Sequence, residues 1–294
     1  MSGPLDVFGL GQCSYDRYAL VDALPLPDQK AEYEPAGEGC GGPVATALVA
    51  LTRWGRRCSF AGVVGDDDEG ERIRADLEAE GVETKHTRTR AGTRTQAALV
   101  TVERGTGRRT ILWHRPTGAE PGAEEIDPQR APIFLTDGLF EVASIELARR
   151  AERVVVDAGT VRPGTLGLIP HAEVFVASES FARAFVGSDA PKEACRKLRD
   201  AGVAVAGVTL GERGYVALAG DSWIEGPAQP AAVVDTTGCG DLFHAGLVEG
   251  MLAGSPWPEC FEFAAWAAAR VSEALGGRAG IPDRGANSQW RDSR

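Results

Sequence analysis

The chain has 294 residues, of which 43% are hydrophobic, and a formal net charge of -11 at pH 7. This length and apolar content suffice for one large core, so we expect a single domain over residues 1–294. The excess of negative charge argues against nucleic acid or an anionic membrane as a partner, because both bind clustered positive charge. The composition is typical of a soluble enzyme.

Short apolar runs bounded by glycine or proline alternate with segments of helical periodicity. The runs predict buried strands at 58–64, 133–136, 154–156, 174–176 and 203–210. Charged and apolar residues at helical spacing predict helices at 70–80, 142–152, 191–201 and 257–274. Such alternation predicts an α/β fold in which helices cover both faces of a mostly parallel sheet.

Two segments interrupt this alternation. Residues 16–38 and 93–116 contain strand-like runs with no helix between them, which suits a small antiparallel sheet with one exposed face. We expect these segments to form a β-sheet lid that projects from the main domain. Beyond Pro282 the composition turns polar and charged, which predicts a flexible tail over 283–294.

The cysteines and the N-terminus indicate the compartment. The six cysteines are scattered, without a Cys-x-x-Cys pair or a histidine at metal-ligand spacing, as expected for buried apolar residues in a reducing compartment. The chain begins almost at once with the strand-like run 6–11 and shows neither a signal-peptide pattern nor about eighteen consecutive apolar residues. We expect a cytoplasmic protein that does not contact membranes.

The most informative motif lies between strand-like residues 231–234 and a helical pattern with apolar residues at 243, 247 and 251. It reads Asp235-Thr236-Thr237-Gly238-Cys239-Gly240-Asp241. Glycines between a strand and a helix let backbone N–H groups converge on an anion, and the helix N-terminus adds partial positive charge. The segment therefore predicts a phosphate cradle.

Asp241 is the unusual residue of this motif, because phosphate oxygens would repel its carboxylate. The placement makes sense if Asp241 takes a proton from an alcohol aligned with a γ-phosphoryl group, while the amides of 238–240 stabilise the developing charge. An aspartate in the first turn of a helix is also favourable for dipole reasons alone. The seven-residue context favours the catalytic interpretation.

The motif resembles the C-terminal signature of the ribokinase-like (PfkB) carbohydrate kinases, Asp-Thr-Thr-Gly-Ala-Gly-Asp, from which only Cys239 departs. Three further segments resemble family motifs in the family's order: 41–47, which opens with Gly41-Gly42, then 62–70 and 208–214. The resemblance covers nearly the whole chain. It implies the ribokinase-like three-layer α/β/α fold and ATP-dependent phosphorylation of a hydroxyl on a small sugar or sugar-like acceptor. It also implies Mg²⁺ as a cofactor and a homodimer paired through the lid.

The family's functional residues transfer to matching positions of this chain. Asp241 would be the general base, and the amides of Gly238, Cys239 and Gly240 the anion hole. The residues that would bind the acceptor are Asp16, Gly41, Gly42 and Thr46. The residues that would bind the nucleotide are Thr209, Gly211, Gly214 and Thr237. Asp235, with Thr237 and the carbonyls of 277–280, matches a loop that binds a monovalent cation such as K⁺ in some relatives.

Three further positions depart from the family pattern. Thr46 stands where the family usually has an asparagine that contacts substrate hydroxyls, and threonine is shorter with fewer donors. Ser178 and Phe181 stand at the ends of the family's Asn-x-x-Glu segment, which helps organise Mg²⁺. Glu179 is near but two positions out of register, so we expect phosphates and water to hold Mg²⁺, with Glu179 acting through water.

Other interpretations stay open. Asp157 and Arg162 would face the phosphates or belong to a solvated loop, and His114 and Arg115 would reach over the substrate or lie on a solvated strand. A nucleoside kinase of the same family and a catalytically degenerate, ligand-binding member are the alternatives for function. A dinucleotide-dependent oxidoreductase is disfavoured because Ser14 stands where its third glycine would fall, and a P-loop enzyme because Gly-Lys-Ser/Thr is missing.

Overall fold

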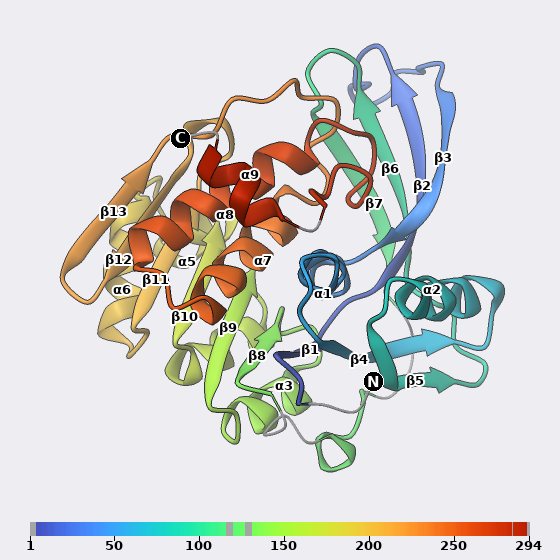
Figure 1. The fold of residues 1–294 in the computed structure, drawn as a ribbon. Coiled ribbons are helices and arrows are strands. Elements are labelled where there is room, and N and C mark those ends of the chain that lie inside the picture. Colours follow the sequence, from blue (N-terminus) through green and yellow to red (C-terminus); the bar gives the residue numbers. More distant parts are fainter. Residues whose placement is uncertain (1–3, 116–119, 127–130, 284, 293–294) are drawn as a thin grey trace.

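A nine-stranded sheet forms the centre of the molecule in this computed structural model, which describes residues 4–115, 120–126, 131–283 and 285–292 (Figure 1). Its strands lie in the order β13 (Ser222–Gly226), β12 (Tyr215–Ala219), β11 (Val205–Thr209), β10 (Val174–Ser178), β9 (Arg153–Ala158), β8 (Ile133–Thr136), β1 (Val7–Leu10), β4 (Cys58–Gly65), β5 (Glu83–Arg90). Neighbours from β5 to β11 are parallel, and the edge hairpin of β12 and β13 is antiparallel. The predicted mostly parallel sheet is confirmed.

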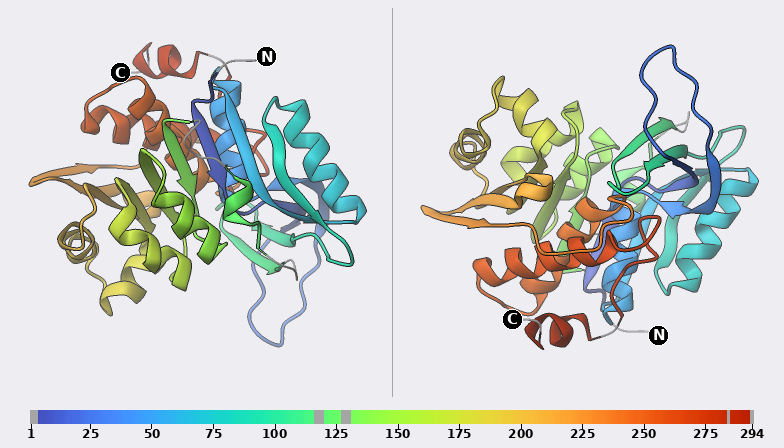
Figure 2. Two further views of the ribbon diagram at one scale, coloured as in Figure 1. Left: turned by 90° about the horizontal axis from the view of Figure 1, so that it is seen from below. Right: turned by 90° about the horizontal axis from the view of Figure 1, so that it is seen from above.

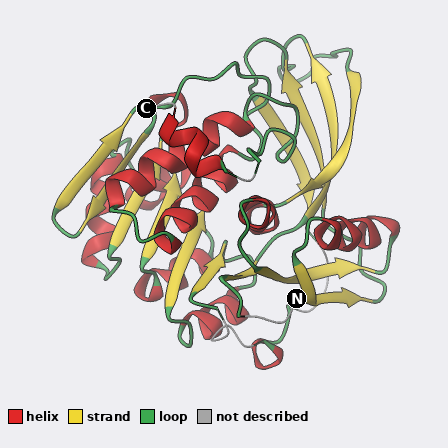
Figure 3. Cartoon of the chain, in the orientation of Figure 1, coloured by secondary structure: helices red, strands yellow, loops and turns green. Residues whose placement is uncertain are grey.

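Helices cover both faces of this sheet (Figures 2 and 3). One apolar core contains residues of α1 (Pro43–Arg53), α2 (Asp68–Ala79), α7 (Cys239–Leu252), α8 (Trp257–Val271) and α9 (Ala286–Asp292). The other contains residues of α3 (Glu141–Ala148), α4 (Pro163–Leu168), α5 (Glu179–Val186) and α6 (Pro191–Asp200). Val7 belongs to the first core and Phe8 to the second, as expected for a strand buried on both faces. The three layers are therefore as predicted.

Most predicted elements are confirmed within a few residues, with two local exceptions. Helix α3 ends at Ala148 rather than 152, because β9 already begins at Arg153. The strand-like segment 231–234 is a loop: Val233 and Val234 are exposed, and the amides of Val234 and Asp235 both donate to the carbonyl of Ser272. An apolar run predicted a strand there, but none of the described strands pairs with it.

A second, four-stranded sheet rises beside the main body (Figure 1). Its order is β3 (Glu34–Gly41), β2 (Ser14–Val21), β6 (Ala97–Glu103), β7 (Arg109–His114). The prediction of an antiparallel sheet is wrong for the central pair, because β2 and β6 are parallel. The chain passes through β4, α2 and β5 between them, and such a long crossover permits parallel pairing. Pro116, the last residue of the predicted lid, lies outside the described residues.

Strand register assigns side chains to the two faces of this small sheet, because directly paired residues share a face. Asp16 pairs with Ala98, which pairs with Trp113, and Val102 pairs with Arg109 two rows away. We call this the inner face. The opposite, outer face carries Arg17, Leu99 and Leu112, again in one row.

The segment predicted to be a flexible tail contains helix α9, which runs from Ala286 to Asp292. Its Trp290 is buried, with its ring 5.5 Å from that of Phe263 on α8. One large aromatic side chain thus packs an otherwise polar segment against α8, and the flexibility of the tail stays a prediction; residues 284, 293 and 294 lie outside the described ranges. None of the described helices is long and apolar enough to cross a membrane.

Candidate active site

The predicted catalytic motif lies at the carboxyl edge of the main sheet, where β9 ends with Asp157 and Ala158 and β11 ends at Thr209. Ligands of open α/β sheets bind at this edge. Helix α7 begins here, and Gly238 immediately before it adopts φ 82°, the left-handed region that favours glycine. A Cβ on Gly238 would also lie 2.6 Å from the carbonyl oxygen of Gly277. The sequence motif thus encodes a tight turn into the helix.

The first turn of α7 presents backbone N–H groups to the space in front of it. The first helical hydrogen bond runs from Leu242 N to the carbonyl of Gly238 at 2.9 Å, so the amides of Gly240 and Asp241 precede the hydrogen-bonded ladder. A Cβ on Gly240 would meet no atom within 4 Å. The amide of Cys239 makes only a long contact, 3.4 Å, with the carbonyl of Thr236. This geometry suits an anion at the helix N-terminus.

Asp235 fixes the loop that leads into this turn. It is fully buried, and one of its carboxylate oxygens accepts hydrogen bonds from Thr237 N at 2.8 Å and Thr237 Oγ1 at 2.7 Å. The other oxygen accepts from Gly276 N at 2.8 Å. Asp235 and Thr237 therefore hold each other and tie the motif to the following glycine-rich loop.

Asp241 lies in a strongly perturbed electrostatic environment. Burial and the neighbouring Asp157 carboxylate raise its pKa to about 7, and Asp16 acts in the same direction. Arg109 and His244 oppose this rise. The fold thus brings together Asp16 from β2, Asp157 from β9, Arg109 from β7 and two residues of α7. A carboxylate whose pKa lies near neutrality is well matched to exchange protons.

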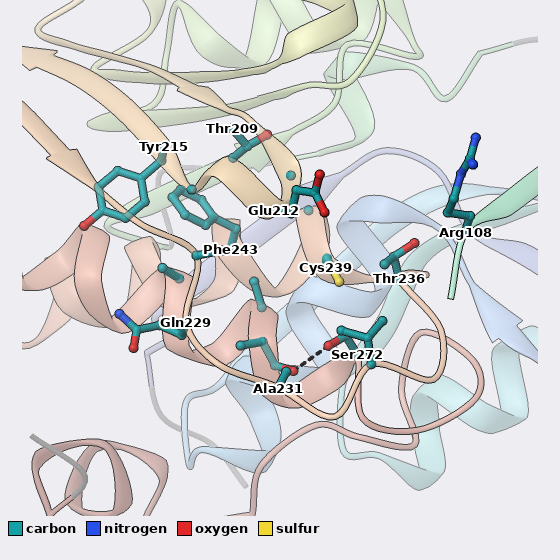
Figure 4. A pocket seen from close by; sticks show the side chains of 18 of the residues that line it. Arg108, Thr209, Glu212, Tyr215, Gln229, Ala231, Thr236, Cys239, Phe243 and Ser272 are labelled. Carbon is teal, nitrogen blue, oxygen red and sulfur yellow. Dashed lines mark hydrogen bonds between the residues drawn. The ribbon is translucent and has the colours of Figure 1, made fainter. Parts of the chain in front are cut away.

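A pocket of about 550 Å³ opens beside the start of α7 (Figure 4). The predicted nucleotide residues Thr209, Gly211 and Gly214 line it together with Cys239 and Gly240. Its wall is largely apolar, and Figure 4 shows Tyr215 and Phe243 on one side and Arg108 on the other. Such a pocket suits a flat, partly apolar group that places a charged end at the helix N-terminus. Thr237 is not among the lining residues.

Asp16 and the Gly41-Gly42 pair form the predicted acceptor side. Asp16 is buried, accepts a hydrogen bond from Ser14 Oγ at 2.7 Å, and has its pKa raised mainly by burial. A Cβ on Gly41 would lie 2.2 Å from Asp16 Oδ2, so only glycine leaves this carboxylate in place. Gly42 has φ 98°, and a Cβ there would lie 2.5 Å from the carbonyl of Gln12. A side chain at either position would collide with a neighbouring group, so both positions require glycine.

Thr46 lies behind these glycines and is fully buried. Its Oγ1 accepts a hydrogen bond of 3.4 Å from Nε of Arg278, which also pairs with Asp76 on α2. The guanidinium of Arg278 therefore lies next to Thr46, whose side chain is shorter than the asparagine usual in the family. No sequence pattern indicates Arg278, because its proximity to Thr46 arises only when the loop after α8 packs against α1.

Two further sequence candidates lie next to the pocket, because Ser178 pairs with Thr209 in the sheet and Glu179 pairs with Arg213 of the 211–213 turn. Glu179 is held by Arg213 at 2.6 Å and Arg183 at 3.2 Å. Ser178 caps α5 by accepting from Phe181 N at 3.0 Å, while the Phe181 ring is buried in the core. Three or more metal-ligating side chains do not cluster anywhere in the described ranges.

The structure also locates the candidates in the lid and in the loop before α4. His114 pairs with Ala97 on the outer face of the small sheet, opposite to Asp16. Arg115 lies over the ring of Trp113 at 5.2 Å from its centroid. Arg162 precedes α4, and its charge lowers the pKa of the buried Asp137, which burial raises.

Sequence reasoning missed two residues of the centre. Arg109 donates from Nη1 to Thr236 Oγ1 at 2.7 Å and lines the pocket, although it comes from the small sheet. No sequence signal connects it to Asp241. His244 had a signal, because a residue three positions after Asp241 on a helix lies on the same side.

Comparisons with known proteins identify the family and the fold. Residues 5–284 match the pfkB family carbohydrate kinase model. The acarbose 7(IV)-phosphotransferase of Actinoplanes sp. is 30% identical, with 97% of this chain and 98% of that protein covered. A nucleoside kinase of Methanothermobacter thermautotrophicus is 26% identical, with 97% and 95% covered. The structure of Arabidopsis thaliana ribokinase complexed with ribose and ATP superposes with a TM-score of 0.82 at 23% identity, covering 98% of this chain and 99% of that one.

Proposed function

Since the chain belongs to the pfkB family of carbohydrate kinases and is an ATP-dependent sugar kinase, we propose that Asp241 is its general base. The observation that carries this proposal is the position of Asp241 at the open N-terminus of α7, with a pKa raised to about 7 by burial and Asp157. A base of this kind is ionised often enough at neutral pH to accept a proton and basic enough to hold it.

ATP would bind in the pocket beside α7. The apolar wall with Tyr215 and Phe243 would receive the base, and the turn Gly211–Arg213 would lie along the nucleotide. The triphosphate would then extend toward Gly240, where the missing side chain leaves open space. Arg109 would supply positive charge from the small sheet.

The chemical step follows from this arrangement. Asp241 removes the proton from the acceptor hydroxyl as that oxygen forms a bond to the γ-phosphorus. The bond between the γ-phosphorus and the bridging oxygen of ADP breaks, and the proton remains on Asp241 until solvent removes it. The amides of 238–240 stabilise the charge on the transferring group. The small sheet, acting as a lid, would exclude water that competes for the phosphoryl group.

Cations complete the proposal. Mg²⁺ neutralises the phosphates when bound, and the pairing of Glu179 with two arginines leaves phosphates and water as its main ligands, with Glu179 acting only through water. Asp235, Thr237 and the carbonyl groups of 277–280 would hold K⁺ beneath the turn. In support, the carbonyl oxygen of Gly277 lies close to the turn, since a Cβ built on Gly238 would be 2.6 Å from it. A cytoplasmic location stays a prediction from the sequence.

The acceptor would bind between Asp16, Gly42 and the inner face of the small sheet. Asp16 would accept hydrogen bonds from two hydroxyls, which is a common way to hold a polyol. Trp113 shares this face and is 42% exposed, so the side of its ring that Arg115 does not cover would stack on an acceptor. An exposed aromatic ring also favours the second candidate, a nucleoside, whose base would stack there.

A panel assay tests the proposal and separates the candidates. Purified protein with ATP and Mg²⁺ would be assayed for ADP release with ribose, fructose, 2-keto-3-deoxygluconate and several nucleosides. We expect turnover with one class, and mass spectrometry should show its phosphorylated product. ATP binding without turnover on any acceptor would instead support a degenerate, ligand-binding protein.

A further inference from the structure

His244 is a buried histidine that the proposed step does not use. It lies on α7 one turn after Asp241, and only 3% of its surface is exposed. Its Nδ1 lies 2.8 Å from the carbonyl oxygen of Gly240 and 3.3 Å from Oδ2 of Asp157. Its Nε2 lies 3.3 Å from the carbonyl oxygen of Val176 on β10.

All three neighbouring atoms are oxygens that accept hydrogen bonds. A neutral imidazole has one nitrogen that donates and one that accepts, so a neutral His244 would turn a lone pair toward an oxygen. Only the protonated ring donates from both nitrogens. The contacts therefore favour an imidazolium, and the Asp157 carboxylate at 3.3 Å supplies the compensating charge.

The charged groups around Asp241 show what this cation does. Asp157 on β9 and Asp16 on β2 disfavour its ionised form, whereas Arg109 on β7 and His244 on α7 favour it. Near the C-terminus of α7, the carboxylate of Glu249 is neutralised by an ion pair with Arg56 at 2.7 Å. Arg109 belongs to the small sheet, whereas His244 is fixed in the main body beside the base.

We propose that His244 is a positioning residue that carries protons on both ring nitrogens, pairs with Asp157 and thereby keeps Asp241 ionised when an acceptor hydroxyl arrives. This inference rests on the proposed role of Asp241 as the base. It assigns Asp157 and His244 a joint role: the carboxylate fixes the ring, and the ring offsets the negative charge that the carboxylate places next to Asp241.

The test measures the ionisation of Asp241 without using catalysis. The difference in unfolding free energy between a protein and its Asp241→Asn variant depends on pH, because the folded state holds the Asp241 proton more tightly than the unfolded chain. Because the pKa is raised, the contribution of Asp241 to stability falls as pH rises from its ordinary pKa of 3.8 to about 7, and the difference then becomes constant. The pH at which it becomes constant reports the pKa of Asp241 in the fold.

Urea unfolding would be followed from pH 4 to 9 in three backgrounds: wild type, His244→Gln, and His244→Gln with Asp157→Asn. We expect His244→Gln to move the onset of the constant region upward by about one pH unit, since it leaves Asp157 uncompensated. The double variant removes both charges and should return the onset to the wild-type region or below it. His171→Gln is the matched control, because His171 lies before β10 at the opposite edge of the sheet.

The pH profile of kcat/KM, measured with the acceptor found in the panel, should show the same upward shift on its acid side for His244→Gln. The variant should have roughly tenfold lower kcat/KM than wild type at pH 6 and little loss at pH 9. An onset that His244→Gln leaves unmoved would overturn the inference, as would equal loss of activity at every pH. Because the unfolding experiment needs no turnover, its outcome is separate from a failure of the kinase proposal in the panel assay.

Discussion

At the scale of single residues, Gly41 and Gly39 offer a matched pair in one strand. A Cβ on Gly41 would lie 2.2 Å from Asp16 Oδ2, whereas one on Gly39 would have Tyr18 as its nearest neighbour at 3.5 Å, an ordinary contact. We expect Gly41→Ala to displace the Asp16 carboxylate and raise KM for the acceptor at least tenfold, with KM for ATP nearly unchanged. Steady-state kinetics on both variants checks this. Equal effects of Gly41→Ala and Gly39→Ala would contradict the acceptor role of Asp16.

Gly240 separates stability from function. A Cβ there meets nothing within 4 Å, and alanine is a better helix former than glycine. Gly240→Ala should therefore leave the unfolding free energy unchanged or raise it by about 0.5 kcal/mol. Because the new methyl group enters the space proposed for the γ-phosphate, kcat/KM for ATP should fall by roughly 10–100-fold. Steady-state kinetics at varied ATP concentration and urea unfolding measure the two effects, and an unchanged kcat/KM for ATP would argue against this location of the phosphates.

Residues of the site differ in how far the sequence predicts them. Gly238, Gly240, Asp241, Thr209 and Gly211 lie in short motifs whose local geometry the sequence determines, so their positions relative to the sheet edge could be predicted. Arg109, Arg278 and Asp157 act through partners more than eighty residues away in sequence, as in the contact of Arg109 with Thr236 at a separation of 127. Only the packed fold brings such pairs together.

At the scale of elements, a single buried side chain attaches the polar helix α9 to the rest of the protein. Trp290 is 4% exposed and packs on Phe263, so Trp290→Ala should cost about 2–4 kcal/mol of unfolding free energy. Arg291→Ala on the same helix changes an exposed residue and should alter stability by less than about 0.5 kcal/mol. Urea unfolding of both variants checks this, and equal stability would mean that α9 is not anchored to α8.

The strands that the sequence predicts well are those buried on both faces. Strands β4, β8, β9, β10 and β11 are continuous apolar runs, because both of their faces are buried, and such runs have few alternatives. The parallel pairing of β2 with β6 depends on how the chain returns through β4, α2 and β5, which no local pattern reveals. Periodicity predicts an element, whereas its partner is fixed by the path of the chain.

At the scale of the whole molecule, the small sheet bears on assembly. Leu99 and Leu112 are paired on its outer face and are 44% and 65% exposed. We propose that this sheet forms the homodimer contact implied by the family resemblance. Leu112→Glu should then weaken association, so that equilibrium sedimentation gives about 31.0 kDa for the variant and twice that mass for the wild type. A wild-type mass of one chain at micromolar concentration would exclude this dimer.

The role of Asp241 as the general base is tested by comparing wild type with Asp241→Asn in ATP binding and in turnover of the acceptor found by the panel. Asparagine keeps the size of the side chain but cannot take the proton. We expect the Kd for ATP to change by less than about threefold while kcat falls by roughly 10²–10⁴-fold, the range for loss of a general base. An Asp241→Asn variant that retains kcat within a factor of two would show that another group accepts the proton.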